Sequence, residues 1–196
     1  MNATEMRELM QRVHESFNEY SQSRGMRPSS APLPGADAAA LAAFEGTHRD
    51  WPRSYKTFLS LHNGWEGFSL VFTLIGAGGA HTEKALKRFD LTIRTFTTRW
   101  TERYGEPTPE KIAEFERGAD LGKKTELDAG IYLPHMMLFG TDFAGSLYYF
   151  YNDGQAAEKE RQVVERDVYG EIIRVSADFP AFLQDTLKFR QSLIRQ

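Results

Sequence analysis

The chain has 196 residues, of which 41% are apolar and 13% aromatic, and its formal net charge is -3 at pH 7. This length and apolar content suit one domain with a sizeable core, so we expect a single domain over residues 1–196. The charge, without a basic stripe, argues against direct binding of nucleic acid. The absence of cysteine excludes disulfides, thiol nucleophiles and thiolate-bound metals.

The sequence also predicts where the protein resides. Its first residues are polar and acidic and do not form a signal peptide. The longest apolar run, around residues 70–77, has the length of a strand and is too short to cross a membrane. We therefore expect a cytoplasmic protein that makes no membrane contact.

Apolar residues at spacings of three and four predict an amphipathic first helix, which Asn2 and Glu5 can cap. A connector over residues 21–35 follows, and its three prolines favour an extended linker or a loop that wraps the domain. The helical stripe consists of Met6, Leu9, Met10, Val13, Phe17 and Tyr20.

Two further helices and a strand complete the first part of the chain. Asp37 can cap the second helix, and the third begins at Pro52 and ends before Gly64. The mostly apolar segment 68–75 predicts one strand, which the glycine-rich segment 76–79 ends.

The most regular pattern of the chain predicts a long helix that ends at Gly105. A short charged helix over 109–117 and a loop to residue 130 are expected after it. The buried stripe of the long helix is expected to contain Leu86, Phe89, Ile93, Phe96, Trp100 and Tyr104.

The periodicity then changes to that of strands joined by short turns, which implies antiparallel neighbours. A final helix follows, with Ser176 or Asp178 as its cap. This order of elements predicts the α+β class rather than alternating βαβ units. The four strands are expected over residues 131–139, 146–151, 162–167 and 171–175.

Strand alternation places Tyr148 and Phe150 on one side of the sheet and Tyr149 and Tyr151 on the other. One pair is expected in the core. The other pair, if exposed, would provide the aromatic anchors of an interface with an acidic rim; alternatively, helices cover both faces of the sheet. The candidate partner-binding residues are Trp65, Glu66, Asp142, Tyr149, Tyr151 and Asp153.

Motifs for catalysis are weak in this chain. Segment 76–79 departs from a dinucleotide fingerprint, and segment 118–125 has the wrong spacing for a phosphate loop. None of the histidines has the spacing of a zinc motif. We therefore predict no cofactor, no metal and no enzymatic activity. The five histidines are His14, His48, His62, His81 and His135.

Three segments, taken in order, resemble a known family. Residues 51–65 read WPRSYKTFLSLHNGW, residues 138–150 read LFGTDFAGSLYYF, and residues 177–183 read ADFPAFL. This set resembles the SUKH superfamily, which includes Smi/Knr-type regulators of fungal cell-wall synthesis and many bacterial immunity proteins. Relative to the smallest members, residues 80–130 look like a helical insertion.

The resemblance implies a mixed, largely antiparallel sheet flanked by helices. For bacterial members it also implies an immunity protein that neutralises a cognate toxin by stoichiometric binding. The first alternative is a regulatory scaffold of the cell-wall-regulator type. A second is a small-metabolite enzyme that uses carboxylates with His62 or His135.

Overall fold

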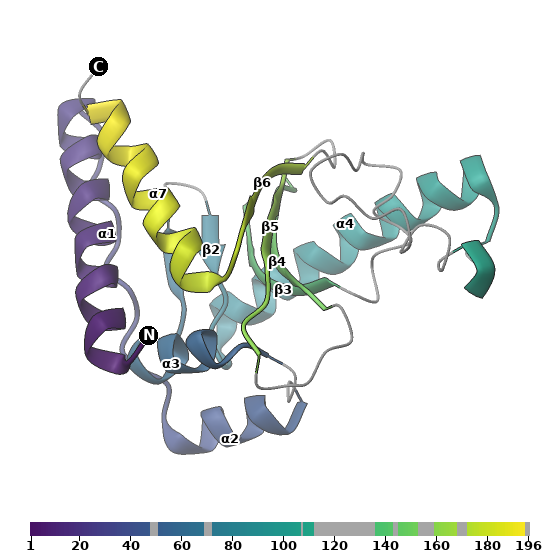
Figure 1. Cartoon of the computed structure of the whole chain (residues 1–196), viewed down its shortest axis with the longest axis horizontal. Coiled ribbons are helices and arrows are strands. Elements are labelled where there is room, and N and C mark those ends of the chain that lie inside the picture. Colours follow the sequence, from purple (N-terminus) through teal and green to yellow (C-terminus); the bar gives the residue numbers. More distant parts are fainter. Residues whose placement is uncertain are drawn as a thin grey trace.

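The computed structural model describes residues 1–47, 51–68, 72–106, 108–111, 136–142, 145–152, 159–167 and 172–194. It belongs to the predicted α+β class, with a six-stranded sheet flanked by helices (Figure 1). Its elements are α1 (Ala3–Ser23), α2 (Ala38–Thr47), α3 (Arg53–Leu61), β1 (Trp65–Phe68), β2 (Phe72–Leu74), α4 (Ala80–Tyr104), β3 (Met136–Thr141), β4 (Leu147–Tyr151), β5 (Val163–Arg166), β6 (Ile172–Ser176) and α7 (Phe179–Ile194).

The sheet has the order β1-β2-β3-β4-β5-β6, and each described pair of neighbours is antiparallel. The predicted antiparallel strands of the second half are confirmed within the described residues. The single strand expected over 68–75 is wrong, because β1 and β2 pair with each other, with Trp65 opposite Leu74. The apolar pattern does not mark β1, because only Phe68 of this strand lies in the apolar run and Glu66 is exposed.

Helices lie on both faces of the sheet (Figure 1). The side of Tyr148 and Phe150 packs in the main core with α1, α3 and α7. The side of Tyr149 and Tyr151 belongs to a second cluster, against which Phe89 of α4 packs. The predicted alternation is therefore confirmed, and of the two arrangements considered for the sheet, the one with both faces covered is correct.

The proline-containing connector wraps the domain along the outer edge of β1. Leu33 N–H donates to Gly64 O at 3.1 Å, and Ser29 Oγ donates to Gly67 O at 3.1 Å. The indole Nε1 of Trp65 donates to Ser30 O at 2.6 Å. The connector thus covers an edge that would otherwise be open to pairing with another chain.

Side chains cap several helices as the sequence predicts. Asn2 and Glu5 form a capping box on α1, and Asp37 Oδ1 accepts from Ala40 N–H at 2.8 Å at the start of α2. The cap of α7 is Asp178, whose Oδ1 accepts from Ala181 N–H at 2.7 Å.

The first turn of α3 has a cap from a distant part of the chain. The carboxylate of Glu160 accepts hydrogen bonds from the N–H of Ser54 at 3.0 Å and from its hydroxyl. No local sequence pattern encodes this contact.

The long helix α4 is confirmed, but part of its predicted buried stripe is wrong. Leu86 is 42% exposed, whereas Ala85 is only 5% exposed and faces the sheet. A small residue at this position allows the helix to approach the strands closely. Residues 109–111 are helical, and residues 112–135, with most of the expected charged helix and loop, lie outside the described residues. The side chains of Phe96, Trp100 and Tyr104 are also outside the described part.

Candidate functional site

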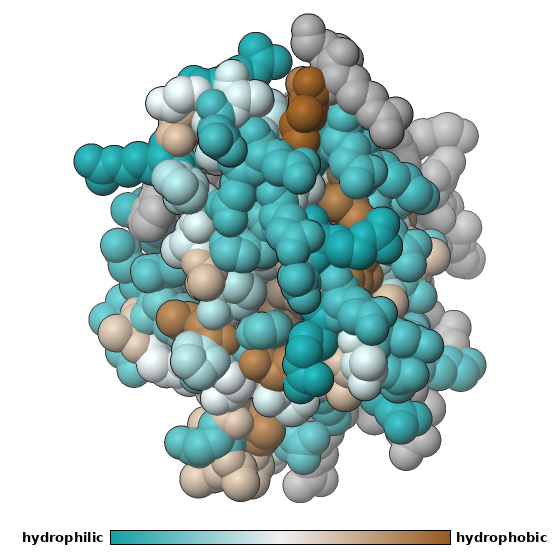
Figure 2. All heavy atoms as spheres, turned by 90° about the vertical axis from the view of Figure 1, so that its left-hand side faces the viewer, coloured by the Kyte–Doolittle hydropathy of each residue, from teal (hydrophilic) through white to brown (hydrophobic). Residues whose placement is uncertain are grey.

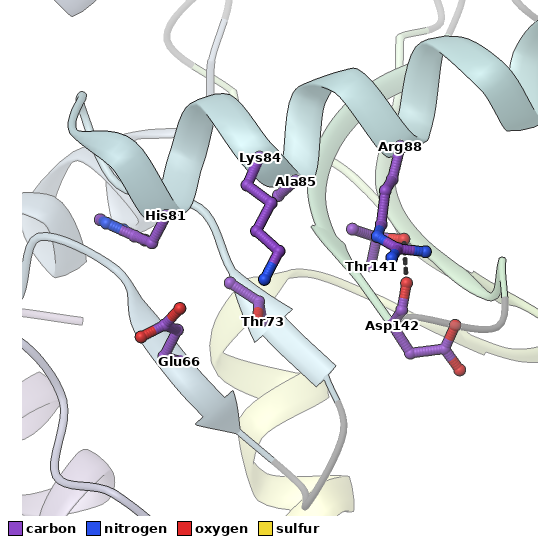
Figure 3. Close-up of a pocket in the computed structure, with 8 residues that line it drawn as sticks. All are labelled: Glu66, Thr73, His81, Lys84, Ala85, Arg88, Thr141 and Asp142. Carbon is purple, nitrogen blue, oxygen red and sulfur yellow. Dashed lines mark hydrogen bonds between the residues drawn. The ribbon is translucent and has the colours of Figure 1, made fainter.

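A small recess forms where the first turns of α4 pass beside strands β1, β2 and β3 (Figure 3). His81, Lys84 and Arg88 follow one another at spacings of three and four, so they share one side of α4. Thr73 and Thr141 are register partners in β2 and β3, so their side chains emerge on the same face of the sheet. The recess is lined by Glu66, Thr73, His81, Lys84, Ala85, Arg88, Thr141 and Asp142.

The size of this recess limits what it can bind. Its volume is about 10 Å³, close to the least space that one water molecule needs. Ligand pockets for small molecules are typically about 300 Å³ or larger. The recess therefore has room for about one water molecule and is too small for a small-molecule ligand.

Cationic groups dominate the side of the recess formed by α4. Lys84 and Arg88 are exposed, and Figure 3 shows Lys84 extending toward Thr73. Burial lowers the pKa of His81, and the nearby Glu66 opposes this shift only in part. Two cations, Lys84 and Arg88, line the recess together with two carboxylates, the exposed Glu66 and the buried Asp142. The exposed cations therefore lie on the α4 side of the recess, and its one exposed carboxylate lies on the β1 side.

Asp142 has a structural role at the β3–β4 turn. Its Oδ1 accepts hydrogen bonds from Gly145 N–H at 2.7 Å and from Ser146 N–H at 2.9 Å, and its side chain is 7% exposed. An aspartate that binds the backbone a few residues ahead stabilises a tight turn. Asp142 and Glu66 both line the recess, but Asp142 is buried and does not provide an exposed acidic rim.

Two of the predicted aromatic anchors lie in the core. Trp65 is 0% exposed and contacts Phe17 and Phe68 edge to face, with ring centroids at 5.9 and 5.1 Å. Tyr149 is also 0% exposed, and its hydroxyl accepts from Arg166 Nε at 2.9 Å. Their proposed role as contact residues depended on exposure, and this condition is not met, because the connector and α1 cover Trp65 and the second cluster encloses Tyr149.

The other predicted positions differ in their surroundings. Glu66 is exposed at the recess, and Tyr151 is half-buried against the second cluster. Asp153 lies outside the described residues, as does His135, which the enzyme alternative invoked. His62 ends α3, where its Nδ1 lies 3.3 Å from Leu33 O.

The glycine-rich segment 76–79 has a packing function. A Cβ on Gly76 would lie 2.3 Å from Asn63 Oδ1, so this position requires glycine. The same Oδ1 accepts from Ala77 N–H at 2.7 Å and ties the segment to the turn before β1. Gly79, with φ of 104°, then precedes the first residue of α4. These contacts position His81 and Lys84 beside the strands.

Two larger hollows lie elsewhere on the surface. One, of about 390 Å³, is a mostly apolar groove between Trp51, the segment 76–79, Leu86 and the start of β3. The other, of about 380 Å³, lies between α1 and α7 and has mainly polar and charged walls. The second hollow brings together Glu5, Glu8, Arg12 and Lys188, whereas Glu83 is the one ionisable residue that lines the first.

Sequence reasoning missed the recess, although one signal was present. Lys84 and Arg88 avoid the apolar stripe of α4, which indicates an exposed side, but the pattern does not reveal which strands lie opposite. Within the described residues, no three or more histidine, aspartate or glutamate side chains cluster in a way that could hold a metal ion. Comparison with known proteins finds no matching family model and no matching curated protein.

Proposed function

We propose that this protein is a SUKH-type immunity protein that binds a cognate toxin in the bacterial cytoplasm and neutralises it by occlusion. In this proposal the protein uses its surface to bind and performs no chemistry on its target. Among the described helices, none is long and apolar enough to cross a bilayer.

The main support is the way in which the three SUKH-like segments meet at one residue, Tyr55 of α3. Its ring lies 5.4 Å from that of Phe139, 5.3 Å from that of Phe150 and 5.0 Å from that of Phe179. These partners come from the second and third segments. Segments far apart in the sequence thus form one core, as expected if they are parts of a single domain type.

A hydrogen bond from the same tyrosine reinforces this arrangement. The hydroxyl of Tyr55 donates to Ile75 O at 2.7 Å, and Phe139 O lies 3.3 Å away. Buried hydrogen bonds to backbone groups specify one packing of the core, because an alternative packing would leave polar groups unsatisfied. Such a core supports a preformed surface, and a preformed surface lowers the cost of tight binding.

Co-expression tests the proposal directly. The tagged protein is produced together with each product of the adjacent genes, and both co-purification and cell survival are measured. We expect one adjacent product to be toxic alone, to co-purify with this protein and to be harmless in its presence. The proposal would be contradicted if this protein rescued cells from none of the toxic adjacent products.

A further inference from the structure

The outward side of α4 differs in charge from the rest of the molecule. The helix carries six lysine and arginine residues against three acidic residues, an excess of three positive charges. Since the whole chain has a net charge of -3, the remainder carries -6. Helix α4 is therefore net positive while the remainder is net negative, and Figure 1 shows this helix extending beyond the sheet.

An apolar side chain stands in the middle of these charges. Leu91 is 67% exposed, the highest value among the large exposed hydrophobic residues of the described chain. Lys87 and Arg88 precede it by one helical turn, and Arg94 follows it by three residues, so all three are its neighbours on the helix surface. Arg94 forms an exposed ion pair with Asp90 at 2.6 Å.

The recess at the start of α4 continues this surface. Lys84 lies seven residues before Leu91, about two turns away on the same side of the helix. The surface therefore combines an exposed leucine with a set of exposed cations. Interfaces typically combine such a central apolar contact with a charged surround.

The side of the molecule formed by α1 and α7 has a different surface. Figure 2 views the side formed by α1 and α7, where hydrophilic residues predominate and apolar atoms reach the surface in separate small areas. Phe189 of α7 is 56% exposed. It provides a matched control for Leu91.

We propose that the α4 surface, defined by Lys84, Lys87, Arg88, Leu91 and Arg94, is the docking surface for an acidic partner protein. This inference rests on the proposed immunity function and specifies the chemistry of the toxin surface. Leu91 enters an apolar depression on the partner, and partner carboxylates pair with the exposed ends of Lys84, Lys87 and Arg88. Complementary charge then speeds association and selects the partner.

Nucleic acid fits this surface less well than an acidic protein does. A net charge of -6 on the rest of the chain repels a polyanion as long as a duplex, whereas a compact acidic patch meets α4 alone. An exposed leucine at the centre also gains little from a phosphate backbone, because phosphate contacts are electrostatic.

The first test uses the adjacent gene product that the wild type neutralises. We expect the double variant Lys84→Glu/Arg88→Glu to slow association about tenfold or more and to weaken rescue, with wild-type thermal stability. Leu91→Ala should weaken binding about tenfold by faster dissociation. The controls Arg7→Glu/Arg12→Glu and Phe189→Ala should bind as the wild type does. Loss of binding in the controls with full binding in the α4 variants would overturn the inference and leave the immunity function intact.

A second test does not need the toxin and separates the two proposals. Poly-L-glutamate is titrated into the ¹⁵N-labelled protein at low salt, followed by a duplex DNA oligonucleotide in a parallel sample. We expect poly-L-glutamate to shift amide signals between residues 81 and 95, and we expect the Lys84→Glu/Arg88→Glu variant to lose these shifts. Absence of shifts in α4, or tighter binding of the duplex, would overturn the α4 inference even if no adjacent gene product is toxic.

Discussion

Replacing Tyr55 by phenylalanine tests whether the core is specified as described. The substitution preserves the ring contacts and removes the hydroxyl that donates to Ile75 O at 2.7 Å. Phe139 O still accepts from Ile75 N–H at 2.8 Å, so one buried acceptor loses its donor. Leaving one buried polar group unsatisfied costs about 1–3 kcal/mol. We therefore expect the free energy of unfolding to fall by about 2 kcal/mol.

Urea denaturation measures this change. The midpoint should fall while the slope of the free energy against urea stays constant, because the amount of buried surface is unchanged. For a chain of this length, the same loss lowers Tm by about 4–8 °C. The control is Tyr20→Phe, at a half-buried tyrosine of α1, which should change stability by less than about 0.5 kcal/mol. An equal loss in both variants, or no loss in Tyr55→Phe, would refute the reasoning.

Three further predictions concern a helix cap, a close backbone approach and a histidine. Glu160→Gln weakens the cap on Ser54 and should lower the free energy of unfolding by about 1 kcal/mol in urea denaturation; wild-type stability would argue against this long-range cap. Gly140→Ala places a Cβ 2.8 Å from Cδ2 of Tyr148 and should lower the free energy of unfolding by about 1–3 kcal/mol. The control Gly46→Ala, where a Cβ meets open space, should leave the melting temperature unchanged or raise it. A larger loss of stability in Gly46→Ala than in Gly140→Ala would contradict the close contact at Gly140. Burial lowers the pKa of His62, so the unfolded state takes up a proton at a higher pH than the folded state does. The free energy of unfolding should therefore fall as pH decreases from about 7, and it should fall less in His62→Asn. Parallel plots of unfolding free energy against pH for the two proteins would contradict this.

Local patterns were sufficient to predict much of this fold. The alternation from Tyr148 to Tyr151 correctly assigned two side chains to each face of the sheet, because side chains in a strand have a period of two. Capping residues likewise marked the starts of α1, α2 and α7. These features depend on residues within a few positions of one another.

The surroundings of the candidate interface residues depend on distant parts of the chain. Trp65 is buried because Ser30 and the connector fold over it, about 35 residues earlier in the sequence. The recess exists because Thr73 and Thr141 become register partners and α4 passes beside them. No local pattern specifies such pairings. The sequence therefore favours the aromatic residues as anchors and does not indicate the basic side of α4.

The most direct test of the central claim, that this protein acts as a stoichiometric binder, is a titration against the purified toxin. The activity of a fixed amount of toxin is measured as increasing amounts of this protein are added. The proposed function predicts a linear loss of activity that is complete at an equimolar ratio. Complete inactivation by a small fraction of an equivalent would show turnover and contradict it.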